Sequence, residues 1–302
     1  MNDVDILIVS NKLDFTTDYV CLELEQRKAR YLRINRDEFE KYLITFDIDS
    51  TELMIGIGGE VFHIAEPCLK SIYYRAPIYL RDIYQPKLSE QSQLYRTQWA
   101  AFVRNLAVFE KPLWINNPVA TFKAENKFLQ LKYARMAGFS CPVTSVSNTC
   151  PVRVLDNAEY IVKSIDPAVL RIEDREAFVY SNRVKGYDLK ASELSLAPVI
   201  IQDYIQPKMD LRVTVIGESV YTVKILSNGR GVEGDWRQVK DKVVFVECEL
   251  PKETTKSCIT LAKSLGLIFG AIDLIESDNN IYFIESLLQK SCELAQDWRE
   301  SS

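Results

Sequence analysis

Two carboxylates follow apolar, strand-like runs late in the sequence. Asp273 comes after Phe269–Ile272, and Glu285 comes after Ile281–Ile284. The residues 277–280, which are typical of a turn, lie between the two carboxylates. If the strands pair antiparallel across that turn, the carboxylates face one place. Hard oxygens that converge beside a triphosphate are typical of a Mg²⁺ site, which uses one or two protein carboxylates; the alternative is a pair of solvated acids at a sheet edge.

Two lysines could supply positive charge to the same place. Lys163 ends the apolar run Tyr160–Val162, where an inward-facing charge is costly unless an anion meets it. Lys127 lies in the first turn of a predicted helix and could direct its ammonium group into the same cleft. A phosphate group is a natural partner for both. Taken singly, each lysine is also compatible with a solvated position at a strand or helix end.

A third cluster follows the apolar strand that begins at Pro198. Its polar and aromatic end, Gln202 to Ile205, could offer backbone N–H and C=O groups to the edge of an adenine ring. In the next predicted strand, alternation places Asp210 and Arg212 on one face. A structural ion pair between these two side chains is an open alternative to a role in binding.

Composition excludes several other classes of chemistry. The chain has one histidine, His63, whereas most zinc hydrolases and Ser-His-Asp enzymes need imidazole as ligand or base. The seven cysteines are odd in number and scattered, so we expect neither a disulfide framework nor a zinc site. The net charge of -5 gives no overall reason to expect nucleic acid or a membrane as partner. Without a long apolar run or a leader, the sequence predicts a soluble, cytoplasmic protein.

The elements that position these residues begin with a predicted open sheet. Runs 5–10 and 30–35 have the length of strands, and the segment 16–27 between them has helical spacing. A hairpin-like stretch over 53–64 is expected to continue the same sheet to about residue 80. We therefore expect a doubly wound N-terminal domain over 1–115.

The remaining segments predict two further domains, over 116–195 and 196–302. A helix is expected over 88–109, with a closing turn over 114–118, and another helix over 125–138, stopped by Gly138. From residue 160 onward the pattern is rich in strands, including one over 177–184. A single helix is expected over 252–265 in this part.

Taken in order, these segments resemble the ATP-grasp superfamily, and within it the microviridin or graspetide ligases that cross-link ribosomally made peptides. The resemblance covers nearly the whole chain. The stretches that carry it are Tyr74–Pro77, Trp114–Pro118, Ala124–Asn148, Ile161–Lys163, Gln202–Ile205, Asp210–Val213, Asp235–Arg237, Gly270–Asp273 and Tyr282–Glu285. It implies an α/β ATP-grasp fold with an N-terminal doubly wound domain, a small central α/β domain and a C-terminal antiparallel-sheet domain.

The resemblance also implies a role for each candidate residue. It assigns Lys127 and Lys163 to the ATP phosphates, and Gln202, Asp203, Tyr204 and Ile205 to the adenine edge. Asp210 and Arg212 are assigned to the ribose and acyl-phosphate region, and Arg237 to the transferring phosphate or the substrate carboxylate. Asp273 and Glu285 are assigned to Mg²⁺. Arg212 and Arg237 are then the catalytic residues. Such a site needs no histidine, because phosphoryl transfer depends mainly on positioning and on cations that stabilise the spreading charge.

The activity implied by the resemblance is an ADP-forming carboxylate ligase with ATP and Mg²⁺ as cofactors. An Asp or Glu carboxylate of a precursor peptide, which has a leader and a core, is activated as an acyl phosphate. A hydroxyl or amine then displaces phosphate to form an ester or amide cross-link. The resemblance also implies a homodimer.

Two departures from the family pattern keep alternatives open. Leu287 stands where the family usually has an asparagine, two residues after Glu285, and the stretch 164–168 lacks the glycines that let a lid wrap phosphates closely. One alternative is a degenerate nucleotide-binding protein with little catalysis. Another is an ATP-grasp ligase that adds amino acids to a small molecule or a protein tail.

Overall fold

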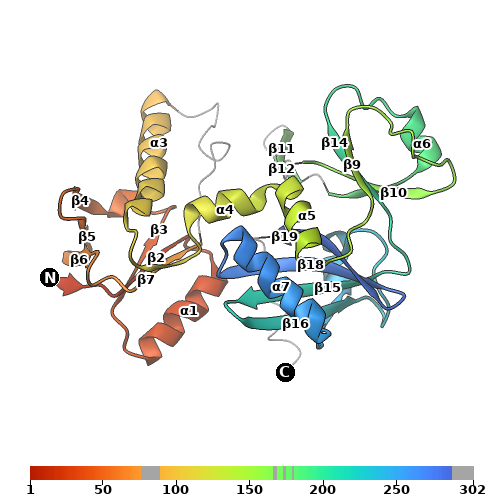
Figure 1. The fold of residues 1–302 in the computed structure, drawn as a ribbon. Helices are drawn as coiled ribbons and strands as arrows, with labels where there is room; N and C mark the ends of the chain where they lie inside the picture. The colour runs from red at the N-terminus through yellow and green to blue at the C-terminus, as the bar shows by residue number, and fades with distance from the viewer. Residues whose placement is uncertain (76–88, 166–168, 173–174, 179, 288–302) are drawn as a thin grey trace. The chain divides into compact units, whose positions relative to one another are not determined.

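The computed structural model describes residues 1–75, 89–165, 169–172, 175–178 and 180–287. Within these ranges the chain divides into two compact units: residues 1–123 with 266–269, and residues 124–265 with 270–287. Figure 1 shows the elements of each unit. Residues 76–77 and 166–168 and the side chain of Leu287 lie outside the described part. The division into three domains stays a prediction.

The first unit contains a parallel sheet with strand order β3-β2-β7-β8. Its strands are β2 (Ile6–Ser10), β3 (Tyr31–Asn35), β7 (Ser71–Tyr74) and β8 (Leu113–Ile115). Helix α1 (Phe15–Gln26) connects β2 to β3. Leu7 and Ile8 point to opposite faces of β2 and are both fully buried, as expected for a parallel sheet covered on both faces. The predicted strand-helix-strand start of the chain is confirmed.

A second sheet in this unit corrects one prediction. The hairpin of β5 (Glu52–Ile57) and β6 (Glu60–Ala65) does not continue the parallel sheet but joins β1 (Asn2–Asp3) and β4 (Leu43–Asp47) in the order β1-β6-β5-β4. Its strands bury one face only, because Leu53 and Ile55 are buried whereas Met54 is 40% exposed. An alternating pattern of this kind suits an antiparallel sheet with one wet face.

Helix α3 (Glu90–Asn105) and the 3-10 turn η2 (Leu106–Val108) confirm the helix predicted over 88–109. Val103 and Leu106 enter the hydrophobic core of the unit, but Leu94 is 62% exposed. The expected turn over 114–118 instead begins as strand β8. A further 3-10 turn, η1 (Phe39–Lys41), lies between β3 and β4.

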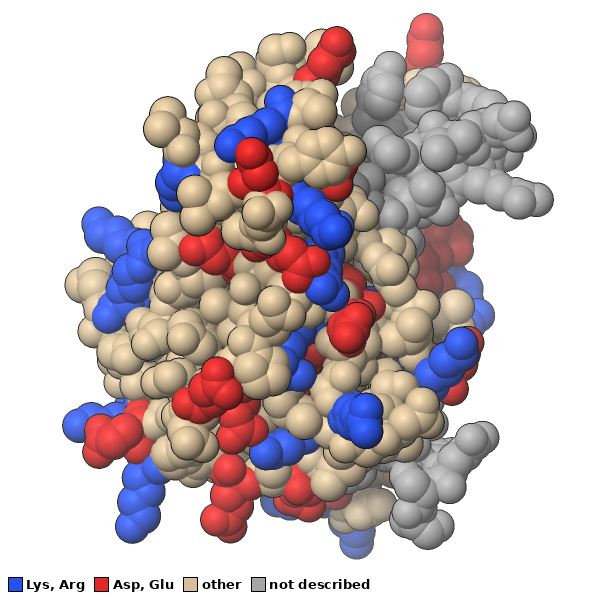
Figure 2. Space-filling model, turned by 90° about the vertical axis from the view of Figure 1, so that its right-hand side faces the viewer, with Lys and Arg blue, Asp and Glu red and all other residues tan. Residues whose placement is uncertain are grey.

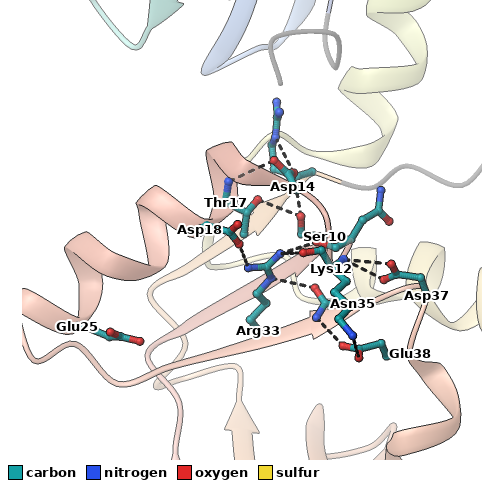
Figure 3. Close-up of polar contacts among 12 residues, drawn as sticks. Ser10, Lys12, Asp14, Thr17, Asp18, Glu25, Arg33, Asn35, Asp37 and Glu38 are labelled. Atoms are coloured by element: carbon teal, nitrogen blue, oxygen red, sulfur yellow. Dashed lines mark hydrogen bonds and ion pairs between the residues drawn. The ribbon is translucent and has the colours of Figure 1, made fainter. Parts of the chain in front are cut away.

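Polar side chains gather where β2 ends and α1 begins (Figure 3). Ser10 donates a hydrogen bond of 2.8 Å to Asp14, and its hydroxyl lies 2.9 Å from that of Thr17. Asp14 caps α1 by accepting from the backbone N–H of Thr17. Arg33, in the middle of β3, joins this strand to the same region through the carboxylate of Asp18. Because capping side chains satisfy the N–H groups of the first turn, this network sets where α1 starts.

The second unit contains a small antiparallel sheet with strand order β13-β10-β14-β9. Its strands are β9 (Thr144–Ser147), β10 (Glu159–Lys163), β13 (Asn182–Lys185) and β14 (Val199–Asp203). The hairpin β11 (Val169–Ile172) and β12 (Arg175–Phe178) and the short helix α6 (Gly186–Ala191) complete this part. The single strand predicted over 177–184 is wrong, because β12 ends at Phe178 and β13 begins at Asn182.

A five-stranded sheet with the order β17-β16-β15-β18-β19 forms the rest of the unit. Its strands are β15 (Met209–Ile216), β16 (Ser219–Leu226), β17 (Val244–Glu247), β18 (Phe269–Ser277) and β19 (Asn280–Leu287). Helix α4 (Pro118–Glu125) ends the first unit, and the second unit also contains α5 (Lys127–Met136), α7 (Lys252–Leu265) and the 3-10 segment η3 (Trp236–Lys242). Helix α7 has the predicted bounds and packs against α5 and the sheet. None of the helices in the described ranges is long and apolar enough to span a membrane.

Candidate active site

A cleft opens in the second unit, with the small sheet and the five-stranded sheet both contributing residues to its lining. Most of the residues singled out in the sequence line it: Lys163, Gln202, Asp203, Tyr204, Ile205, Asp210, Arg237, Asp273 and Glu285. Lys127 and Arg212 do not line the cleft, but Arg212 donates to the lining residue Asp273, and Lys127 donates to Ser164, which follows the lining residue Lys163.

The two late carboxylates are direct cross-strand neighbours. Asp273 of β18 is paired with Glu285 of β19, and the strands are joined by a turn in which Asp278 and Asn279 both have positive φ. A two-residue turn of this type matches the twist of an antiparallel hairpin. The side chains of Asp273 and Glu285 are 13% and 15% exposed. The expectation that both carboxylates face one place is confirmed, and neither is a solvated edge acid.

Two arginines hold this acid pair. The Nη1 atom of Arg212 donates to Oδ1 of Asp273 at 2.5 Å. The Nη2 atom of Arg237 donates to Oδ2 of Asp273 at 2.7 Å and to Oε1 of Glu285 at 3.2 Å. Asp235 positions Arg237 by accepting from its backbone N–H and from its Nη1 atom. Burial lowers the pKa of Arg237, but the carboxylates of Asp273, Glu285 and Asp235 raise it above its usual value.

The lysines lie beside the acid pair. Lys163 ends β10 and is 8% exposed, and the Nζ atom of Lys127 donates to the carbonyl oxygen of the next residue, Ser164, at 3.1 Å. Burial lowers the pKa of Lys163, while the charge of Glu285 raises it. Burial also raises the pKa of Glu285, but Lys163 and Arg237 outweigh this and lower it to about 2. Positive charge therefore gathers on one side of an ionised carboxylate.

The segment predicted to meet adenine lies on the cleft wall at the end of β14. Gln202 is buried, and its side chain donates to the hydroxyl of Thr144 at 2.9 Å. The backbone N–H of Asp203 donates to the carbonyl of Val143, and that of Tyr204 donates to the carbonyl of Glu159. A base bound here would therefore have to use other backbone groups of the segment, such as its carbonyl oxygens.

Asp210 and Arg212 do not pair with each other. Asp210 lies 2.8 Å from the ammonium group of Lys208, whereas Arg212 pairs with Asp273. Burial raises the pKa of Asp210 to about 6, and Lys208 opposes that shift. Lys208 also donates to the carbonyl oxygen of Gly234. Lys208 lines the cleft and was missed in the sequence, because it lies in an irregular segment with no strand or helix pattern around it.

The donor set suits a divalent cation held jointly with a triphosphate. In the described residues there is no group of three or more histidine, cysteine or acidic side chains that could hold a metal. Asp273 and Glu285 are nevertheless adjacent, and Mg²⁺ usually combines one or two carboxylates with phosphate oxygens and water. Arg237 donates to one oxygen of each carboxylate, so a cation held by these side chains would compete with it for their oxygens.

The charge that matters is local rather than spread over the surface. On the face shown in Figure 2, lysine and arginine side chains are interspersed with aspartate and glutamate, with uncharged residues between them. The net charge of the chain is -5. The cations that could meet a triphosphate are the buried lysines and arginines of the cleft, where low solvent access strengthens their fields.

Comparison with known proteins is consistent with this geometry. Residues 181–296 match the family model described as a RimK-like ATP-grasp domain. The fold is similar to that of a RiPP-associated ATP-grasp ligase from Chryseobacterium gregarium, solved with ADP and a leader and core peptide: TM-score 0.77, 24% identity, covering 95% of this chain and 89% of that one.

Two further relatives extend the comparison. The macrocyclase MdnC of Microcystis aeruginosa MRC, solved with the precursor peptide MdnA, has a TM-score of 0.74 and 20% identity, covering 93% of this chain and 90% of that one. A probable alpha-L-glutamate ligase from Marinobacter nauticus is 23% identical over 214 residues, which is 68% of this chain and 67% of that protein. These likenesses establish the ATP-grasp fold, and the implied α/β class with a C-terminal antiparallel sheet is confirmed.

Proposed function

Because the chain has the ATP-grasp fold and carries a RimK-like ATP-grasp match over residues 181–296, we propose that it is an ADP-forming carboxylate ligase. Its substrate is a ribosomally made precursor peptide, whose Asp or Glu side chains it joins to hydroxyl or amine groups of the same peptide. The observation that carries the proposal is the convergence of Lys163, Arg237, Asp273 and Glu285 in one cleft. The solved structures of similar fold with bound peptides support the choice of substrate.

The residues of the cleft divide the work of the first step. Lys127 and Lys163 bind phosphate oxygens, and the segment from Gln202 to Ile205 orients the base. A substrate carboxylate oxygen attacks the γ-phosphorus of ATP, the bond to the β-phosphate oxygen breaks, and ADP leaves with an acyl phosphate formed. Positioning and cationic stabilisation account for most of the catalysis in such transfers.

Arg212 and Arg237 serve the second step by stabilising negative charge on the acyl phosphate. A hydroxyl or amine of the peptide attacks the acyl carbon, loses its proton and releases phosphate, so that an ester or amide forms. Mg²⁺, when bound, neutralises charge on the phosphate oxygens. Asp273 and Glu285 are the residues that would hold it.

A mass-spectrometric assay tests the proposal. The protein is incubated with Mg-ATP and a Thr/Ser- and Asp/Glu-rich peptide encoded beside it, and peptide mass and ADP are followed together. We expect loss of one water per bond formed, abolished by Lys163→Ala and by Asp273→Ala. An unchanged peptide with unconsumed ATP would contradict the proposal.

A second candidate function is addition of free glutamate to a protein or small-molecule acceptor. The relatives named probable alpha-L-glutamate ligase favour it, because they match 68% to 71% of this chain. The same assay separates the two functions: a glutamate ligase adds residue mass when glutamate is supplied, whereas a peptide cross-linking enzyme removes water without it. A degenerate nucleotide-binding protein would do neither.

A further inference from the structure

Gln130 is a buried polar residue of α5 that the proposed mechanism does not use. It is 3% exposed, and its amide is fully engaged. Oε1 accepts from the backbone N–H of Ser286 at 2.9 Å, while Nε2 donates to the carbonyl oxygens of Ser286 at 2.9 Å and Ala124 at 2.6 Å. The side-chain amide thus pairs with both backbone groups of Ser286, as a neighbouring strand would.

The hydrogen bonds between Gln130 and Ser286 lie beside a β-bulge in an edge strand of the sheet. β19 is the edge strand, and its register against β18 shifts directly beside the acid pair: Asp273 faces Glu285, but Leu274 faces Phe283. Ile284 is therefore an extra residue, and such bulges disrupt the ladder and redirect neighbouring side chains. Glu285 lies between the bulge residue Ile284 and Ser286, whose backbone is hydrogen-bonded to Gln130.

The far side of the bulge is also tied to the segment that follows α5. The backbone N–H of Phe283 donates to the carbonyl oxygen of Ser140 at 2.8 Å. Ser140 and Gln130 thus bracket Ile284 and Glu285 from the open edge of β19. Lys127, the first residue of α5, donates a hydrogen bond to the carbonyl oxygen of Ser164. Helix α5 therefore contacts the residue that follows Lys163 and the residue that follows Glu285.

We propose that Gln130 is a positioning residue for the cation site: by holding Ser286 it fixes the direction of the Glu285 carboxylate beside Asp273. The inference rests on the proposed function, since it assumes that the acid pair binds a divalent cation with a nucleotide. Gln130 touches neither carboxylate. It acts as the outer partners of metal ligands do, whose loss typically lowers metal affinity by about 10- to 100-fold.

The experiment compares Gln130→Met with the unaltered protein. Methionine keeps the length of the side chain but loses all three hydrogen bonds. Mn²⁺ affinity is measured by electron paramagnetic resonance with a saturating non-hydrolysable ATP analogue, and nucleotide affinity is measured separately with a fluorescent ADP analogue in EDTA. We expect Mn²⁺ affinity to fall about 10- to 100-fold and nucleotide affinity in EDTA to change less than twofold. Gln130→Glu, which keeps an acceptor for the Ser286 N–H, is expected to fall between the two.

Leu261→Ala serves as the control for general loss of stability, because Leu261 is fully buried in α7. It should lower the melting temperature without separating the two affinities. Equal Mn²⁺ affinities for Gln130→Met and the unaltered protein would overturn the inference, as would a parallel fall of both affinities in Gln130→Met. Absence of Mn²⁺ binding by the unaltered protein with nucleotide would instead overturn the proposed function.

Discussion

Arg237 donates to both of the carboxylates that would hold a divalent cation. Its Nη2 atom is within hydrogen-bonding distance of Asp273 and Glu285 at once. A divalent cation therefore competes with a guanidinium that is already bound. We predict that Arg237→Met raises the affinity of the nucleotide-free protein for Mn²⁺ while it abolishes ligase turnover.

The size of the effect follows from the contacts that the cation must break. A hydrogen bond between charged groups contributes about 1.5–3 kcal/mol net. Removing one such interaction from the competition corresponds to a gain in Mn²⁺ affinity of roughly 10- to 150-fold. Arg212 remains hydrogen-bonded to the other oxygen of Asp273, so that carboxylate keeps a charged partner in the variant.

Mn²⁺ titration followed by electron paramagnetic resonance, without nucleotide, measures the affinity directly. Lys224→Met is the matched control, because Lys224 pairs with Glu276 of the same sheet and its removal deletes one positive charge without touching either carboxylate. Long-range charge alone would shift both variants alike. The reasoning fails if Arg237→Met binds Mn²⁺ no more tightly than Lys224→Met does.

Three other substitutions test the rest of the cleft. Lys163→Met should lower nucleotide affinity at least about 10-fold, as expected when a phosphate loses a charged partner. It should also raise the free energy of unfolding at pH 7, because a buried charge is removed. The control Lys190→Met, at an exposed ion pair, should change neither the nucleotide affinity nor the unfolding free energy when both are measured by calorimetry. Glu285→Gln should reduce turnover by about 10²-fold or more yet leave nucleotide binding in EDTA intact, and equal turnover would contradict a role beside Asp273. The pKa of Asp210 is raised to about 6, so the folded state favours the protonated form of this side chain. Relative to Asp210→Asn, the protein should therefore lose up to about 3 kcal/mol of unfolding free energy as the pH rises from about 4 to about 6, with no further loss above about pH 6. Parallel urea-denaturation profiles of the two proteins across this pH range would refute the prediction.

Local sequence patterns were sufficient to place the two acids on neighbouring strands but not to pair them. Asp273 and Glu285 follow apolar runs joined by a short turn, and the register of that turn alone would place Asp273 opposite Ile284. The bulge at Ile284, which only the structure shows, brings Glu285 opposite Asp273. The sequence also indicated that Lys163 could meet an anion, because a charge at the end of an apolar strand must be either paired with an anion or exposed. Lys127 was predicted in the first turn of a helix over 125–138, and the structure makes it the first residue of α5, which begins two residues later than predicted.

Sheet membership was beyond the reach of these patterns. The hairpin over 53–64 was recognised as a hairpin, but its strand pattern does not say which strands will lie beside it. The structure pairs it with β1 and β4 rather than with the parallel sheet. One exposed face on β5 excludes the interior of a covered sheet, and that exposure is known only once the other elements have packed.

The sequence alone determined which residue types could bind phosphate and metal, and that the two acids end neighbouring strands of one hairpin. Only the tertiary structure decided their partners: Arg212 meets Asp273 and not Asp210, Arg237 bridges both acids, and Gln130 reaches Ser286 across 156 positions of the chain. Contacts at such separations depend on the packing of whole strands and helices, and burial of the apolar faces sets that packing. The spacing of the polar residues in the sequence therefore does not encode them.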